Sequence, residues 1–494
     1  MSWPAWLYLG YDLPPGAMTE TEGVSREVVD AAVARARSSQ APWYGLGLRE
    51  RGRALRRLAS RARADGELAR IISSETGKPL FEAIGFEIAY LCEVTRFLSG
   101  RKGRRALAED VRSSLIFPHK RARVAWRPRG VVAVIGPSNF PLLNNFGDVV
   151  APLLAGNSVL LKPSPDSPLT SRRMEVLWKD AGLPEGVFQV VEGGTETGSA
   201  LVDTCDMVFF TGGVAAGREI AARAGQRLIP CVAELGGKSA MIVLADADLR
   251  AAARAAVWGA FAGAGQVCIR VERVLVEGSV ADEFGRLVTA ETTRLRLDRS
   301  EDADVGPVLL AARRERCRTL VADAVARGAH LLAGGGEVGD AFFAPTVLDR
   351  VPPDAAVAVE ETFGPVLPII RVTGAEEAIR LTNDSPLGLS GSVWSRDEVR
   401  ARDIARRLDA GSLCINDVLV NYFFVSAPLG GMKASGLGFR HGPEALRQFC
   451  HPQTIVEDRP LARLLAAWVR GQLGFPYRKR VLAVVRWLLG AIYR

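Results

Sequence analysis

Hydrophobic residues occur in short continuous runs through the first half of this chain, and helical segments separate the runs. Residues 131–135, 157–161 and 206–210 are runs of this kind, typical of strands buried on both faces. Between them, apolar residues recur at helical spacing. Strands that alternate with helices predict βαβ units and a parallel sheet, so we expect an α/β fold.

Other patterns predict the rest of the architecture. Residues 25 to about 110 are rich in Ala and Arg with apolar residues at helical spacing, and Ser25 is a plausible N-cap. Residues 113–128 partly alternate, which predicts two strands around a turn. After Cys268 a second α/β segment continues to about residue 448.

Composition is that of a large globular protein whose excess positive charge lies at one end. The 494 residues predict two to four domains, and 48% hydrophobic with 24% charged residues is ordinary for packed cores. Residues 459–494, called the tail below, contain eight of the basic residues and no acidic one. Without the tail, 55 basic residues balance 55 acidic ones. A neutral body argues against nucleic-acid binding.

The tail has the pattern of a basic amphipathic helix. Arg463 and Arg470 are seven residues apart, as are Lys479 and Arg486, so each pair shares a helical face, while Leu and Trp occupy other faces. This pattern suits the surface of an anionic membrane. The alternative is a helix packed on the body or on a second subunit, with solvated arginines. Arg486 interrupts the apolar run, which disfavours a membrane span.

The cysteines and the N-terminal residues indicate the cellular compartment in which we expect the protein. Seven Cys and four His show no metal-ligand spacing, so we expect no metal site; the Cys positions are 92, 205, 231, 268, 317, 414 and 450. Free thiols fit a reducing compartment. Residues 1–22 are irregular and lack the features of a signal peptide. We expect a cytoplasmic protein, with peripheral contact at the inner face of a membrane if the tail binds lipid.

Candidate chemistry gathers where the predicted strands end. Asn139 follows the first strand, Lys162 follows the second, and Gly212 with Gly213 follows the third. Ligands of parallel sheets bind beyond the carboxyl ends of the strands. Cys268 follows a run of small residues that lets a substrate approach its thiol closely. We therefore predict one site that contains all of these residues.

Five motifs in a fixed order give the chain a resemblance to a known family. They are Ile135-Gly-Pro-Ser-Asn139-Phe-Pro141, Val232-Ala-Glu234-Leu-Gly-Gly-Lys238, Gly259-Ala-Phe-Ala-Gly-Ala-Gly-Gln-Val-Cys268, Glu360-Glu361-Thr-Phe363-Gly-Pro365 and Pro428-Leu-Gly-Gly-Met-Lys-Ala-Ser435-Gly. Over about residues 25–450 the chain resembles the aldehyde dehydrogenase superfamily. The resemblance implies a homodimer or homotetramer in which a Rossmann-type NAD(P)-binding domain (23–112 and 129–236), a catalytic domain (237–444) and a β-element for oligomerisation (113–128 and 445–458) precede the tail.

The resemblance assigns three catalytic roles. Cys268 would be the nucleophile that forms a thiohemiacetal and then a thioester, and Asn139 would donate a hydrogen bond to the oxyanion. Glu234 would activate the water that hydrolyses the thioester; its apolar surroundings predict a raised pKa. Members that transfer the acyl group to coenzyme A generally lack this Glu, so a free carboxylic acid is the implied product.

The cofactor implied by the resemblance is NAD or NADP. The residues implied to bind it are Ile135, Pro137, Lys162, Ser164, Gly212, Gly213, Gly217, Leu235, Glu361 and Phe363. Members that prefer NAD often carry a Glu where this chain has Pro165, although Asp166 can replace that acid. Both coenzymes stay open, with a lean to NAD.

The small-molecule substrate is an aldehyde, and the sequence leaves its identity open. Residues 435–442 and 475–477 resemble the fatty aldehyde dehydrogenase branch. A membrane-directed tail favours a medium- or long-chain aldehyde, with succinic semialdehyde or another short aldehyde as the alternative. Ser138 replaces a usual Trp, and residues 269–272 replace small residues, so we expect an altered pocket. A non-catalytic scaffold has no use for Cys268, Glu234 and Asn139 together.

Overall fold

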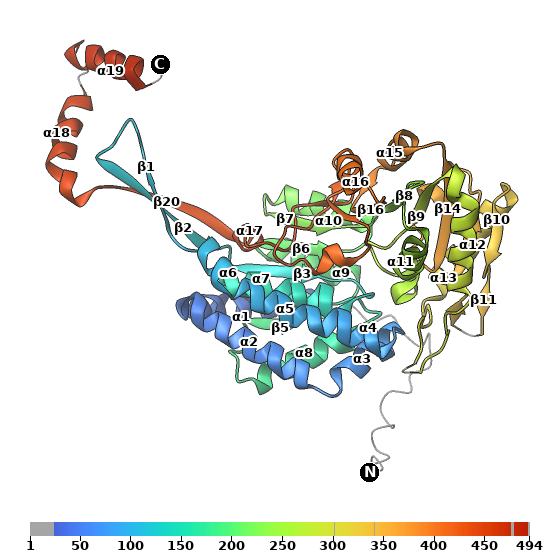
Figure 1. Ribbon diagram of the computed structural model, residues 1–494. Coiled ribbons are helices and arrows are strands. Elements are labelled where there is room, and N and C mark those ends of the chain that lie inside the picture. Colours follow the sequence, from blue (N-terminus) through green and yellow to red (C-terminus); the bar gives the residue numbers. More distant parts are fainter. Residues whose placement is uncertain (1–23, 301, 340, 476–478, 493–494) are drawn as a thin grey trace.

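The computed structural model describes residues 24–494 except 301, 340, 476–478 and 493–494, and two large sheets form its body (Figure 1). The residues predicted to be irregular at the N-terminus lie outside this range. In the described chain, the first sheet has six strands, parallel except at the edge strand β19. Their order is β19 (Gly436–Leu437), β7 (Cys231–Glu234), β6 (Met207–Thr211), β3 (Val131–Ile135), β4 (Ser158–Lys162) and β5 (Phe188–Val190).

Alternate residues of the central strand β3 face different helices, because successive side chains of a strand point to opposite faces. Val132 and Val134 belong to the larger core, and Val131 with Ala133 belongs to the smaller one. The helices that contribute to the larger core on this side are α2 (Gly47–Ala64), α3 (Leu68–Thr76), α5 (Ala89–Leu98), α7 (Gly147–Ala155) and α8 (Leu169–Asp180). The smaller core is formed with α1 (Arg26–Gly45), α9 (Thr195–Thr204) and α10 (Val214–Gln226).

The predicted parallel sheet and α/β class are confirmed. The strands predicted at 157–161 and 206–210 each begin and end one residue later, at β4 and β6. Ser25 stands at the N-cap of α1 as predicted, but its side chain makes no capping hydrogen bond to the helix backbone.

A second sheet carries the segment after Glu234. Within the described chain it has seven strands, of which only β10 runs antiparallel to its neighbour. Their order is β10 (His330–Ala333), β13 (Thr346–Asp349), β14 (Val366–Val372), β9 (Arg273–Glu277), β8 (Ala240–Val243), β16 (Ser390–Trp394) and β17 (Ser412–Ile415). The longer helices of this half are α11 (Leu249–Phe261), α12 (Ala281–Thr292), α13 (Ala311–Ala326), α15 (Ala375–Asn383) and α16 (Glu398–Ala405).

Short elements complete the body. They are α4 (Leu80–Glu82), α6 (Arg101–Ala106), α14 (Ala356–Val359), α17 (Ala445–Gln448), and the strand pairs β11 (Glu337–Val338) with β12 (Phe342–Phe343) and β15 (Leu387–Gly388) with β18 (Met432–Lys433). Wide helical turns at 83–88 and 141–146 lead into α5 and α7.

A three-stranded antiparallel arm extends away from this body (Figure 1). It consists of β1 (Asp110–Ser113), β2 (Lys120–Pro128) and β20 (Cys450–Asp458). The two strands predicted within 113–128 are thus β1 and β2, with β1 displaced toward the N-terminus. The third strand comes from the far end of the chain.

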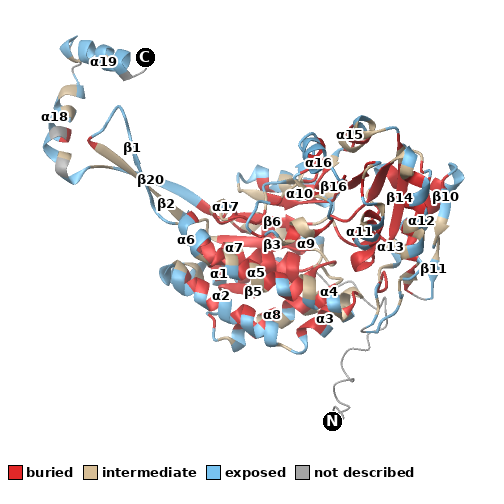
Figure 2. Cartoon of the chain, in the orientation of Figure 1, coloured by how far each residue is buried: buried red, intermediate tan, exposed pale blue. Residues whose placement is uncertain are grey.

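The tail forms two helices at the far end of the arm, α18 (Arg463–Leu473) and α19 (Lys479–Ile492) (Figure 1). Arg470 Nη1 lies 2.6 Å from Asp458 Oδ2, which ties α18 to β20. Figure 2 shows the contrast in burial, with buried residues concentrated in the two sheets and exposed ones along the tail. None of the described helices is long and apolar enough to cross a bilayer.

Candidate active site

Cys268 follows a tight turn of small residues. The backbone of this turn packs so closely against a neighbouring loop that larger side chains would not fit. Gly263, Ala264 and Gly265 all have positive φ, at 58°, 52° and 72°. A Cβ on Gly265 would lie 2.3 Å from the carbonyl oxygen of Gly364, so a side chain is excluded there. The predicted small-residue run therefore brings the Cys268 segment against the loop that carries Phe363.

The Cys268 thiol is half-buried in a pocket, and burial there disfavours the thiolate. Burial raises the pKa of Cys268 to about 12, and the nearby Arg440 guanidinium opposes that rise. A thiol needs a base or a cation to become a nucleophile at neutral pH. The other groups that influence it are Glu234 and Glu361, so the two predicted acids and the predicted nucleophile lie in one site.

Asn139 is held directly beside the Cys268 segment. Its side-chain Nδ2 donates to the carbonyl oxygen of Gln266, two residues before Cys268, at 2.7 Å. Its own carbonyl oxygen accepts a hydrogen bond from Lys78 Nζ at 2.9 Å. Lys78 is in turn paired with the buried Glu87, so the loop after β3 is fixed from behind. The second N–H of the Asn139 amide can donate to a substrate oxygen.

Glu234 ends β7 and is buried. Burial raises its pKa to about 8, against the opposing effect of Arg440, as its apolar setting predicted. Its Oε1 lies 3.9 Å from Arg440 Nε and makes no hydrogen bond to another described group. A carboxyl with a pKa near neutral is suited to accept a proton from water.

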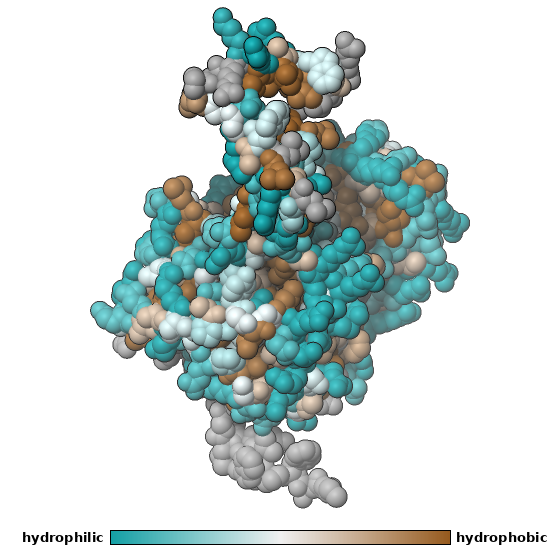
Figure 3. Space-filling view, turned by 90° about the vertical axis from the view of Figure 1, so that its left-hand side faces the viewer, coloured by the Kyte–Doolittle hydropathy of each residue, from teal (hydrophilic) through white to brown (hydrophobic). Residues whose placement is uncertain are grey.

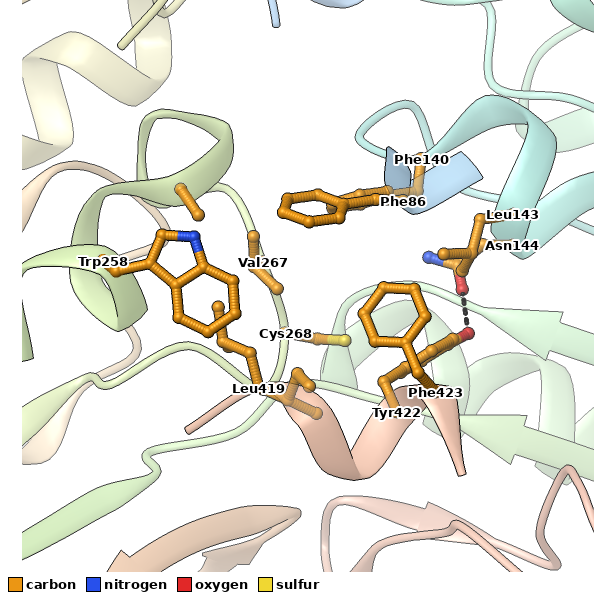
Figure 4. Close-up of a pocket in the computed structure, with 12 residues that line it drawn as sticks. Phe86, Phe140, Leu143, Asn144, Trp258, Val267, Cys268, Leu419, Tyr422 and Phe423 are labelled. Carbon is orange, nitrogen blue, oxygen red and sulfur yellow. Dashed lines mark hydrogen bonds between the residues drawn. The ribbon is translucent and has the colours of Figure 1, made fainter. Parts of the chain in front are cut away.

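The pocket beside Cys268 is lined almost entirely by apolar side chains (Figure 4). Its lining residues are Phe86, Phe140, Leu143, Asn144, Trp258, Ala262, Val267, Cys268, Ile269, Leu419, Tyr422 and Phe423. The two polar ones satisfy each other, since Tyr422 Oη donates to Asn144 Oδ1 at 2.8 Å, the bond drawn in Figure 4. No lysine or arginine of the described chain lines this pocket.

The residues predicted to hold the adenosine end of a dinucleotide lie at the carboxyl ends of β3 and β4. Ile135 pairs with Lys162 across the sheet. Burial lowers the pKa of Lys162 to about 8, and its Nζ donates only weakly to Pro163 O at 3.3 Å. Ser164 Oγ donates to Asp166 Oδ2 at 3.3 Å, so the carboxylate that the Pro165 position lacks is present one residue later.

The predicted pyrophosphate region is the start of α10. Gly213 is the N-cap and an added Cβ there would meet no atom within 4 Å, which leaves open space beside the first amides of the helix. A Cβ on Gly217 would lie 2.4 Å from Leu235 Cδ2, so this glycine serves the packing of α10 on Leu235. Gly212 is fixed by the ring of Phe210, which a Cβ would meet at 2.5 Å. Pro137 is partly buried after β3.

Glu361 and Phe363 lie on the other side of this region. Glu361 Oε1 accepts from the Gly237 N–H at 3.1 Å, and burial raises its pKa to about 7. Phe363 has a φ of 53°, and the guanidinium of Arg313 lies 5.1 Å from its ring centroid. Open amides at a helix start, a partly free lysine and an acid for ribose hydroxyls fit a nicotinamide dinucleotide.

Residues 269–272, which depart from the usual family pattern, form a buried ionic cluster and not a second reactive group. Arg270 Nη1 and Lys238 Nζ lie 2.7 and 2.6 Å from the Glu272 carboxylate. Burial tends to raise the pKa of Glu272, but the two cations outweigh it and lower the pKa to about 2. Glu272 also accepts the backbone N–H groups of Thr362 and Phe363. Only Ile269 of this segment lines the pocket.

Several residues of the site escaped the sequence analysis. Asp148 and Arg440 surround Glu234, and Arg313 bridges Ser138 and Gln266 from the first turn of α13. A signal existed for the first two. Asp148 is the one charge in an apolar stretch of α7, and Arg440 lies inside the glycine-rich segment 435–442.

The chain is similar to known proteins over most of its length. A 4,4'-diapolycopene aldehyde oxidase of Methylomonas sp is 39% identical over 398 residues, covering 79% of this chain and 74% of its own. A Mycobacterium ulcerans protein provisionally named an NADP+-dependent succinate-semialdehyde dehydrogenase is 37% identical over 444 residues, covering 88% and 85%.

Solved structures show the same likeness. The NAD-dependent aldehyde dehydrogenase of Sinorhizobium meliloti has a TM-score of 0.84 with 35% identity, covering 89% of this chain and 88% of its own. A Mycobacterium tuberculosis aldehyde dehydrogenase complexed with NAD+ has a TM-score of 0.83 with 34% identity, covering 88% and 90%. The model of the aldehyde dehydrogenase family matches residues 16–455. The chain therefore belongs to the aldehyde dehydrogenase family, whose members oxidise aldehydes with NAD or NADP.

Proposed function

We propose that this enzyme oxidises an apolar, medium- or long-chain aldehyde to the carboxylic acid. The observation that carries the substrate class is the pocket beside Cys268, where seven of the lining side chains are Phe, Trp, Leu or Val. Each methylene buried there contributes about 0.8 kcal/mol, or about fourfold in affinity. The carboxylate of succinic semialdehyde would be buried without a cationic partner, which costs several kcal/mol.

Aromatic side chains continue from this pocket to the surface. Phe86 lies 6.3 Å from the ring of Trp258 and 5.8 Å from that of Phe423. Phe81, 73% exposed, packs on Phe86 at 6.3 Å between ring centroids. This aromatic path supports an alkyl or polyene chain longer than the pocket itself.

The proposed reaction uses three residues of this chain. Cys268 reacts as the thiolate, after its proton has passed to Glu234 and on to solvent; the sulfur bonds to the aldehyde carbon, and Asn139 donates to the oxygen that becomes negative. A bound nicotinamide coenzyme supplies the oxidation that turns this adduct into a thioester. Glu234 then takes a proton from water as the hydroxyl oxygen bonds to the carbonyl carbon, and the C–S bond breaks to free the acid and the Cys268 thiolate.

The coenzyme is NAD in this proposal. Ser164 holds the Asp166 carboxylate next to the region of Lys162, where it would accept from a ribose hydroxyl and repel a 2′-phosphate. Residues that hold the coenzyme would be Lys162, Ser164, Glu361 and the first amides of α10.

The test is the formation of reduced coenzyme by wild type and Cys268→Ala, followed by absorbance. Hexanal, decanal and succinic semialdehyde are each paired with NAD and with NADP, without coenzyme A. We expect decanal with NAD to give the highest kcat/KM, and Cys268→Ala to give none. A preference for succinic semialdehyde would disprove the proposed substrate class. Turnover that requires coenzyme A would disprove the proposed hydrolysis of the thioester by water.

The tail, in the same proposal, places the enzyme on an anionic membrane surface where apolar aldehydes dissolve. Leu464, Trp468 and Trp487 are 90, 63 and 71% exposed, and the tail carries no acidic residue. Figure 3 shows brown hydrophobic residues beside teal hydrophilic ones at this end of the molecule. Exposed apolar and basic side chains on one helix are the composition of interfacial helices.

Vesicle co-sedimentation tests this part separately. Full-length enzyme is expected to bind vesicles of anionic phospholipid and not neutral ones, with binding weakened by salt. The double variant Trp468→Ala/Trp487→Ala should lose binding, whereas Leu228→Ser, on a still more exposed apolar residue of the body, should not. Recovery with neither kind of vesicle would mean that the tail packs on protein, and equal recovery with both would mean that its basic residues do not direct the binding.

A further inference from the structure

Arg440 lies at the centre of a buried polar cluster behind the reaction pocket. Its Nη1 donates to Asn144 Oδ1 at 2.8 Å and also to the Tyr422 hydroxyl, and its Nη2 donates to Thr211 Oγ1 at 3.0 Å. The guanidinium also lies 5.6 Å from the ring centroid of Phe209. Residues from the 141–146 turn, β6 and the 420–423 turn therefore fix its position.

Two buried carboxyl groups flank this guanidinium. Asp148 Oδ1 lies 3.4 Å from Arg440 Nη1, and Glu234 Oε1 lies 3.9 Å from Arg440 Nε. Arg440 Nε makes no hydrogen bond to another group of the described chain, which leaves it available to interact with the nearby Glu234 carboxylate. With water excluded, each charge acts on the next more strongly than it would at a surface.

We propose that Arg440 is a positioning residue for thioester hydrolysis, which holds Glu234 as the carboxylate that takes a proton from water, and that Asp148 sets how much of the Arg440 charge acts on Glu234. The proposal rests on the function proposed above. It concerns only the second half of that reaction, in which water adds, the C–S bond breaks and Cys268 leaves as thiolate.

The two neighbours act on Glu234 with opposite sign. The Arg440 charge lowers the pKa of Glu234 and the Asp148 charge raises it, on top of the rise caused by burial. Loss of the Arg440 charge must therefore raise the pKa of Glu234, and loss of the Asp148 charge must lower it. The titratable groups around this cluster are Glu234, Asp148, Arg440, Tyr90, Tyr422, His441, Cys268 and Glu361.

An activated aryl ester tests hydrolysis without coenzyme, because it acylates a nucleophilic thiol directly and releases a coloured phenolate. A burst of phenolate reports the acyl-enzyme at Cys268, and the slower phase reports its hydrolysis. In wild type the slow phase should rise with pH through about 8, as Glu234 loses its proton.

The variants give signed outcomes. Arg440→Gln should move this rise upward by about one pH unit or more, and so slow hydrolysis about tenfold below pH 8. Asp148→Asn should move it downward, and Arg440→Lys should lie between wild type and Arg440→Gln. Arg51→Gln removes another buried arginine, far from the pocket, and should not move it.

If Arg440 has only a structural role, the variants should lower the maximal rate of hydrolysis without changing the pH at which the rate rises. Alternatively, that pH would move in the same direction in Arg440→Gln and Asp148→Asn. Either result overturns the proposal. If Arg440→Gln does not fold, the downward shift in Asp148→Asn still decides it. If the variants oxidise aldehyde normally and the pH dependence of hydrolysis does not move, the proposed role of Arg440 is rejected and the proposed function stands. Wild type that forms no acyl-enzyme would reject the thiol mechanism together with it.

Discussion

A single hydrogen bond orients the side chain of Asn139 for its proposed role. Its Nδ2 donates to Gln266 O at 2.7 Å, and this fixes the amide next to the segment that carries Cys268. The sequence analysis predicted a catalytic role for this residue and its position after the first strand of the sheet. The contact that orients it involves a residue 127 positions away, which no local pattern reveals.

Asn139→Ala should remove a hydrogen bond that strengthens as the substrate oxygen becomes negative. We expect kcat/KM for the preferred aldehyde to fall by about 10²–10³, equivalent to about 3–4 kcal/mol, with coenzyme binding unchanged. Steady-state kinetics and a separate fluorescence titration with coenzyme measure the two effects. Equal losses in both would point to a distorted fold instead.

Asp166 should decide coenzyme preference. Asp166→Ala removes the carboxylate that accepts a hydrogen bond from Ser164, and with it the proposed repulsion of a 2′-phosphate. The ratio of kcat/KM for NAD over NADP should fall by about tenfold or more, since a hydrogen bond to a charged group contributes about 1.5 kcal/mol or more. Asp180→Ala, at the end of α8, is the control that should leave the ratio as it is.

At the scale of elements, the connection from β7 to β8 joins the two sheets and also shapes the site. A Cβ on Gly236 would lie 2.2 Å from Glu361 Oε2, so the predicted coenzyme residue Glu361 can occupy its position only because this residue is glycine. The glycines of this motif thus serve close approach between the two halves of the body.

Gly236→Ala should displace the carboxylate of Glu361, the flexible end of that side chain, and so raise the KM for coenzyme with little loss of stability. Gly225→Ala in α10, where a Cβ meets nothing within 4 Å, is the matched control and should change neither KM nor kcat. A KM for coenzyme unchanged in Gly236→Ala would contradict the proposed role of Glu361.

The strands of the first sheet were predictable because each is a continuous apolar run with its own local signal. The arm was predictable only in part. β1 and β2 are neighbours in sequence, but β20 pairs with β2 over nine residues, from Lys120↔Asp458 to Pro128↔Cys450. Such a pairing depends on how the whole body folds, and the family resemblance alone associated the two segments.

At the scale of the molecule, the arm is a projecting sheet with an exposed apolar surface and an open edge at β20 (Figure 1). Ile455 and Val456 are 52 and 60% exposed, and Leu115 at the arm's turn is 79% exposed. Open strand edges with apolar side chains pair readily with another chain. We predict that a second copy of this chain covers the arm, in a homodimer or homotetramer.

Val456→Arg should weaken that assembly, because it places a charge in an apolar contact. Sedimentation velocity at several protein concentrations should show a smaller species for this variant than for wild type. Val399→Arg changes an equally exposed residue of the body and should leave the assembly intact. A wild type that sediments as a monomer at all concentrations would disprove the prediction.

The sequence by itself determined the α/β class, the strand ends and the candidate reactive groups, because apolar runs and glycine-rich turns are local and Cys268, Asn139 and Glu234 lie in recognisable motifs. Only the tertiary structure decided what surrounds them. The apolar pocket collects residues from 86 to 423, and Arg440 reaches Glu234 and Asp148 across 206 and 292 positions. Charge and hydrophobicity act through space, so the proposed substrate class and the proposed tuning of Glu234 both rest on packing.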